Sequence, residues 1–109
     1  MNVDGTLPLS LQIYKAHVEW NKLRHEFDLL DGMHDVLKAQ KVTEFVNDGK
    51  PVSRAENIVK GSAWNEEYVK GWARARHLML DAQAKHAYLV NLAQEQRDDQ
   101  FHERFQAKL

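Results

Sequence analysis

The chain has 109 residues, of which 43% are hydrophobic and 28% charged, so its length and composition are those of one ordinary globular domain. Its 15 Lys and Arg residues nearly balance 16 Asp and Glu residues, and the formal net charge of -1 excludes a strongly basic nucleic-acid clamp and a strongly acidic DNA mimic. Because there is no cysteine, disulfides, thiolate zinc fingers, Fe–S clusters and a cysteine nucleophile are excluded as well.

The beginning of the chain does not have the pattern of a targeting signal. Residues 1–11 carry Asp4 and no basic cluster, and Pro8 and Ser10 interrupt their apolar run, unlike a secretory signal. The chain also lacks a run of about 18 apolar residues, the length that a membrane span requires. We therefore expect a cytoplasmic protein without a membrane partner.

The first predicted element is a long amphipathic helix from about residue 10 to residue 46. Apolar side chains recur at alternating steps of four and three, which is the spacing of one helix face and not of a strand. This stripe comprises Leu9, Ile13, Ala16, Trp20, Leu23, Phe27, Leu30, His34 and Leu37. Gly32 interrupts the segment, and the stripe broadens there to include Met33 and Val36. We expect a kink or a rotation at Gly32 rather than a full break.

A turn and a short helix are predicted next. The run Asn47-Asp48-Gly49-Lys50-Pro51 combines residues that adopt the left-handed conformation at a helix end with a proline that cannot continue the helix. Ser53 and Glu56 then have the spacing of a capping box, which predicts a short helix over about residues 54–60. The pair Gly61-Ser62 predicts a break, with the serine capping the following helix.

A second long helix is predicted from about residue 63 to residue 93, or to residue 108 if the polar tail continues it. Its broad apolar face comprises Trp64, Tyr68, Trp72, Ala75, Leu78, Met79, Ala82, Leu89, Leu92 and Ala93. From Gln94 to Gln100 the sequence is polar, and Phe101, Phe105 and Leu109 then follow at steps of four. We expect residues 94–109 to form a solvated helical extension or a frayed tail.

These elements predict a single all-α domain over residues 1–109, in which two long antiparallel helices are joined by a short one. A two-helix hairpin buries only one stripe per helix and cannot enclose a core by itself. We therefore expect self-association into a homodimer or a higher homo-oligomer, with a four-helix bundle as the commonest form. The residues expected to carry the core and the assembly are Trp20, Leu23, Phe27, Leu30, Tyr68, Trp72, Met79 and Leu89.

No set of residues has the spacing of a catalytic or metal centre. The serines at 53 and 62 are explained by capping, and no G-x-S-x-G turn, H-E-x-x-H motif or phosphate-binding glycine pattern occurs. Asp31 with His34 and His77 with Asp81 have only weak metal-ligand spacing. His34 and His86 fall on the apolar stripes, where a polar residue usually fixes the register through a hydrogen bond. We expect no enzymatic activity, no cofactor and no metal.

The amphipathic helices and the lack of a catalytic motif predict a non-enzymatic interaction module that self-associates through its aromatic stripes and binds another macromolecule. The alternative function is that of a nucleic-acid-associated factor. Lys70, Arg74 and His77 share one face of the second long helix, Arg76 is close in sequence, and Trp72 offers a stacking surface. Residues 1–36 hold three basic and six acidic residues, whereas residues 37–86 hold nine and six. On this interpretation Lys70, Arg74 and Arg76 would contact phosphates, although the chain lacks the basic pI typical of such proteins.

Three segments together resemble a known type of protein. They are Pro51-Val52-Ser53-Arg54-Ala55-Glu56, Gly61-Ser62-Ala63-Trp64-Asn65-Glu66-Glu67-Tyr68 and Ala73-Arg74-Ala75-Arg76-His77. In this order they are similar to small uncharacterised helical proteins of phages and prophages, over roughly residues 10–93. The resemblance implies a phage-type accessory protein, sometimes near replication or recombination functions, with no catalytic residues to transfer. If the protein is phage-encoded, we expect it in the host cytoplasm, with a host or phage protein as its partner.

Overall fold

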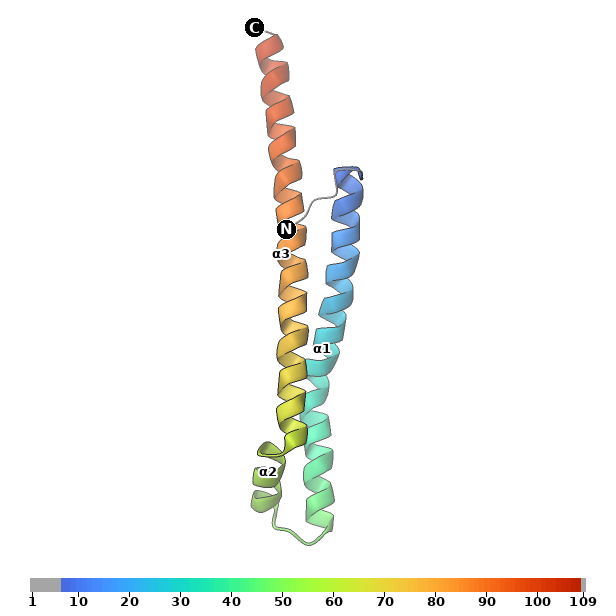
Figure 1. Ribbon diagram of the computed structural model, residues 1–109, viewed down its shortest axis with the longest axis vertical. Coiled ribbons are helices and arrows are strands. Elements are labelled where there is room, and N and C mark those ends of the chain that lie inside the picture. Colours follow the sequence, from blue (N-terminus) through green and yellow to red (C-terminus); the bar gives the residue numbers. More distant parts are fainter. Residues whose placement is uncertain (1–6, 109) are drawn as a thin grey trace. The chain divides into compact units, whose positions relative to one another are not determined.

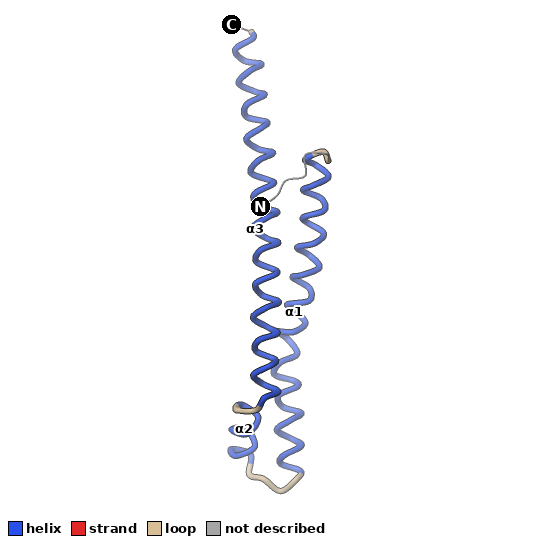
Figure 2. Tube along the Cα trace, in the orientation of Figure 1, coloured by secondary structure: helices blue, strands red, loops and turns tan. Residues whose placement is uncertain are grey.

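The computed structural model describes residues 7–108, and every regular element in that range is a helix: α1 (Leu9–Asn47), α2 (Val52–Lys60) and α3 (Ala63–Ala107) (Figures 1 and 2). The prediction of an all-α fold with a short helix between two long ones is confirmed. Both long helices contribute to two compact units. We call Arg24–Leu78 the turn unit, and Met1–Leu23 with Met79–Leu109 the terminal unit.

Helix α1 is continuous through Gly32, where a Cβ atom would meet no atom within 4 Å. The helix ends in the turn that the sequence predicts. The N–H of Lys50 donates to the carbonyl of Phe45 over 3.1 Å, and the N–H of Gly49 donates to the carbonyl of Val46 over 3.0 Å. This pair of bonds is a Schellman motif, which requires a left-handed residue, and Gly49 has a φ of 93°. The carbonyls at the end of α1 are thereby satisfied.

The predicted capping box at the start of α2 is wrong. The helix begins at Val52, and no side chain caps it, because Pro51 occupies the N-cap position with an extended backbone (φ -59°, ψ 148°). The carbonyl of Pro51 already accepts from the N–H of Ala55 over 3.0 Å, so Ser53 lies inside the first turn and cannot act as the cap. The side chains of Ala55 and Val59 lie on one face of α2 and are buried, at 0% and 1% exposure.

The predicted break between α2 and α3 is confirmed. Ser62 Oγ accepts from the N–H of Asn65 over 3.2 Å, the bond of an N-cap serine to the third residue of a new helix. At the other end, the helical extension predicted for the polar tail is confirmed as far as Ala107, and every side chain of residues 94–108 is exposed. The prediction for Leu109 lies outside the described residues.

In each unit a segment of α1 lies beside a segment of α3, and the two run in opposite directions. In the turn unit, Phe27 contacts Trp72 and the later residue His34 contacts the earlier residue Trp64. In the terminal unit, Trp20 contacts His86. The antiparallel pairing that the sequence predicts is therefore present within each unit.

The core is thin in the described part of the chain. Its buried hydrophobic side chains are those of Ala16, Ala55, Val59, Ala82 and Leu89. Fourteen large hydrophobic side chains of the described residues are exposed, so these side chains remain in contact with water. None of the described helices combines the length and apolarity needed to cross a membrane.

Candidate functional site

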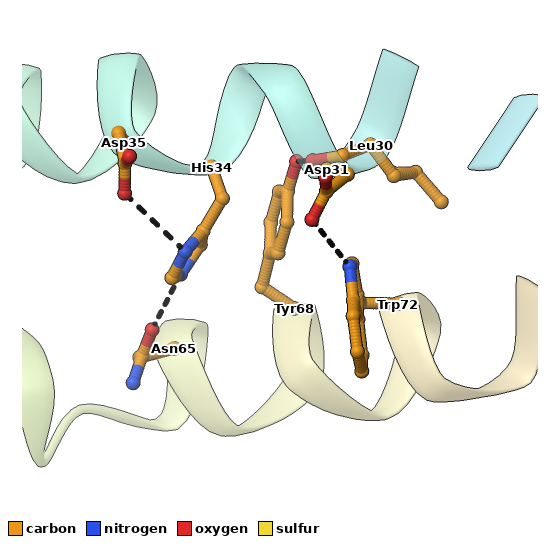
Figure 3. Close-up of polar contacts among 7 residues, drawn as sticks. All are labelled: Leu30, Asp31, His34, Asp35, Asn65, Tyr68 and Trp72. Carbon is orange, nitrogen blue, oxygen red and sulfur yellow. Dashed lines mark hydrogen bonds and ion pairs between the residues drawn. The ribbon is translucent and has the colours of Figure 1, made fainter. Parts of the chain in front are cut away.

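An aromatic and polar seam joins α1 to α3 in the turn unit (Figure 3). The ring of Phe27 lies 5.4 Å from that of Trp72, and the ring of His34 lies 4.8 Å from that of Tyr68. Trp64 packs on Tyr68 at 5.5 Å. Ring separations of this size are typical of favourable aromatic contacts. The seam therefore holds the two helices together mainly through half-buried rings.

Two hydrogen bonds from α3 to α1 give this seam a defined register. The hydroxyl of Tyr68 donates to the backbone carbonyl of Leu30 over 2.5 Å, and the indole Nε1 of Trp72 donates to Asp31 Oδ1 over 2.9 Å (Figure 3). A shift of one helix along the other by one residue would break both bonds. These aromatic residues thus contribute packing area and also specify the alignment of α1 with α3.

His34 is held in one tautomer by a third cross-helix bond. Asn65 Nδ2 donates to the carbonyl of Lys60 over 3.0 Å, so Asn65 Oδ1 is the acceptor that faces His34 Nε2 at 3.0 Å (Figure 3). His34 Nε2 therefore carries the proton, and Nδ1 faces Asp35 Oδ1 at 4.0 Å. The prediction that His34 fixes the register through a hydrogen bond is confirmed.

Replacing Tyr68 with Phe should lower the free energy of unfolding by about 0.5–1.5 kcal/mol, because the ring contacts remain while the bond to Leu30 is lost. Chemical denaturation followed by circular dichroism measures this change. The matched control is Tyr14→Phe, since the Tyr14 side chain is 64% exposed and should be nearly neutral. Equal effects of the two substitutions would contradict the role given to the Tyr68 hydroxyl.

The terminal unit has a different contact set between α1 and α3. The ring of His86 lies 5.4 Å from Trp20 and 5.3 Å from His17, so the predicted inward position of His86 is confirmed. Leu89 is buried at 1% exposure. An open cavity of about 330 Å³ lies beside it, with Ala16 and Ala82 among its lining residues. Packing in this unit therefore depends strongly on Leu89.

The eight residues predicted to carry the core and the assembly all lie on the sides of α1 and α3 that face each other within one chain. Leu89 is buried, and the other seven are half-buried: Trp20, Leu23, Phe27, Leu30, Tyr68, Trp72 and Met79. The rings of Trp20, Phe27 and Trp72 and the hydroxyl of Tyr68 make contacts between α1 and α3. These side chains are therefore already engaged in the fold of a single copy.

The basic residues predicted for nucleic-acid binding do not form one continuous face. Lys70 Nζ lies 3.2 Å from Glu66 and 3.8 Å from Glu67, so its charge is partly neutralised. Arg74 and Arg76 are exposed, but they are two residues apart on a helix and point to nearly opposite sides. A phosphate group on one side of α3 can therefore contact Arg74 or Arg76, but not both.

Sequence reasoning missed a second apolar face on α1, which points away from α3. In the turn unit it consists of Leu29, Met33 and Val36, exposed at 51%, 48% and 55%. We call these three residues the outward α1 face. Their spacing of four and three residues places them on one side of the helix, next to the stripe that contacts α3. The broadening of the predicted stripe at Met33 and Val36 was the signal for this face.

In the terminal unit, α1 carries a similar exposed set: Leu11, Tyr14 and Val18, at 38%, 64% and 48% exposure. Their steps of three and four residues again place them on one side of the helix. Apolar side chains that remain exposed at helical spacing are typical of surfaces that contact another helix.

No three His, Asp or Glu side chains of residues 7–108 gather in a way that could hold a metal ion. Comparison of the chain with known protein families, with curated proteins and with solved structures found no match in any of the three.

Proposed function

We propose that the protein is a non-enzymatic helical interaction module that self-associates through the outward α1 face. The observation that carries this proposal is the exposure of Leu29, Met33 and Val36 while a different side of α1 is already occupied by α3. Burial of such side chains against a second helix is favourable by roughly 25 cal/mol per Å² of apolar surface.

The thin core supports the same proposal. Val59 and Leu89 are the large side chains of the described residues that are almost fully buried, so one copy gains little from hydrophobic burial. A second copy laid against α1 would add a contact surface without disturbing the seam. This is the way in which helix pairs usually complete a bundle. A role as a phage-type accessory protein in the host cytoplasm is consistent with such a module.

The experiment compares the solution mass of the wild-type chain with that of a triple variant, Leu29→Ser, Met33→Ser and Val36→Ser. Serine removes the apolar surface without adding charge, and the variant should be monomeric at concentrations where the wild type is a dimer. Light scattering after size-exclusion chromatography measures the mass, and circular dichroism checks that the helices remain.

The matched control is Phe101→Ser with Phe105→Ser, which removes two exposed aromatic side chains from α3 and should leave the mass unchanged. If the control became monomeric while the α1 variant stayed a dimer, the outward α1 face would not be the contact surface. If the wild type itself were a monomer at all concentrations, self-association would be ruled out.

A further inference from the structure

The turn unit has a groove of about 370 Å³ between α1 and α3. Its lining residues are Asp31, His34, Asp35, Tyr68, Val69 and Trp72. The outward α1 face contributes no residue to this groove. Asp35 is two residues after Met33 and lies roughly 160° around the helix from it. The groove is therefore a different surface from the one proposed for self-association.

The groove carries negative charge. Its lining includes two aspartates and no lysine or arginine. The Asp35 side chain is 98% exposed, and Asp31 Oδ1 accepts from the indole Nε1 of Trp72 over 2.9 Å, which holds this carboxylate in place. A positively charged group would therefore complement the groove.

Two hydrogen-bond acceptors of the groove also face each other. Because His34 Nε2 carries the proton, His34 Nδ1 is an acceptor, and it lies 4.0 Å from Asp35 Oδ1. Neither atom can donate to the other. The side chain of His34 is 28% exposed, so a group in the groove can reach it. A group with several N–H donors would satisfy both acceptors.

Aromatic rings complete the lining. The ring of Tyr68 lies 4.8 Å from that of His34, and Trp72 follows one helical turn later on α3 (Figure 3). Cations are attracted to the faces of such rings, and the planar guanidinium group of arginine also stacks on them. Arginine has five N–H donors, whereas the lysine ammonium is a compact, strongly hydrated charge. The groove should therefore prefer arginine to lysine.

We propose that this groove binds an arginine side chain of a partner protein. The guanidinium group pairs with the carboxylates of Asp31 and Asp35 and donates to His34 Nδ1. It packs against the rings of Tyr68 and Trp72. This inference goes beyond the proposed self-association and does not rest on it, because the outward α1 face takes no part in the groove.

Titration of the isotope-labelled chain with the blocked peptide acetyl-Gly-Arg-Gly-amide, followed by NMR, tests this proposal. The indole N–H resonance of Trp72, assigned by comparison with Trp72→Phe, should shift and saturate. The same peptide with citrulline in place of arginine keeps the shape but lacks the charge, and it should cause no saturable shift. A lysine peptide should bind more weakly than the arginine peptide.

A double variant, Asp31→Asn with Asp35→Asn, should raise the Kd of the arginine peptide by about tenfold, because it removes both charges of the groove. The fold should persist, since an asparagine side-chain oxygen can still accept from Trp72. Circular dichroism checks this. The matched control is Asp28→Asn with Asp48→Asn, which removes the same charge from exposed residues of the turn unit outside the groove lining. It should leave the Kd within about twofold of the wild type.

Three results would overturn the proposal. They are the absence of a saturable shift with the arginine peptide, equally tight binding of the citrulline or lysine peptide, and equal effects of the two double variants. None of them depends on the mass of the chain in solution. Failure of this proposal is therefore distinguishable from failure of the proposed self-association.

Discussion

Replacing Leu89 with Ala is expected to lower the free energy of unfolding by about 2–5 kcal/mol, the largest effect of any single truncation considered for this chain. Leu89 is 1% exposed, and it borders a cavity of about 330 Å³ that Ala16 and Ala82 also line. Because those neighbours are small, they cannot fill the space that the truncation leaves. The loss should therefore lie in the upper half of the range, and urea denaturation followed by circular dichroism measures it.

The matched control for this prediction is Leu80→Ala. Leu80 belongs to the same unit and the same helix, but its side chain is 38% exposed, so its truncation should cost less than about 1 kcal/mol. Equal losses for the two leucines would show that burial is not the reason for the effect.

Replacing Phe27 with Ala is expected to lower the free energy of unfolding by about 1–3 kcal/mol. Truncating a fully buried phenylalanine to alanine usually lowers the free energy of unfolding by about 3–5 kcal/mol. Because Phe27 is half-buried, its truncation should lower this free energy by less. The substitution removes the ring that packs on Trp72 at 5.4 Å but leaves the bond from Trp72 to Asp31 in place. Urea denaturation measures the loss, and fluorescence should show that the Trp72 ring has become more exposed to solvent.

The control for Phe27 is Phe101→Ala. The Phe101 side chain is 67% exposed on the C-terminal extension of α3, so its loss should change the free energy of unfolding by less than about 0.5 kcal/mol. If truncation at Phe101 were as costly as truncation at Phe27, the seam would not be the main source of stability in the turn unit.

Helix positions could be predicted from the sequence because their signals are local. The spacing of apolar residues predicts α1 and α3. Gly49 and Pro51 predict the end of α1, and Ser62 predicts the start of α3. The start of α2 could not be predicted from the capping-box pattern alone. Pro51 already supplies the first carbonyl of that helix, so the helix begins before Ser53 could cap it.

The contacts across the seam could be predicted only in part. The sequence places His34 on the apolar stripe, but its partner Asn65 is 31 residues away and becomes identifiable only when the alignment of α1 with α3 is known. The bond between Trp72 and Asp31 depends on the same alignment. The outward α1 face was missed for a different reason. A helix with apolar residues on two different sides gives a weak signal for each of them.

The most direct test of the account is the mass of the untagged wild-type chain, measured by light scattering over a dilution series at low and high salt. Self-association through the outward α1 face predicts a particle of twice the 12.7 kDa chain mass that dissociates on dilution. A mass of one chain at every concentration would contradict the proposed self-association and the surface assigned to it.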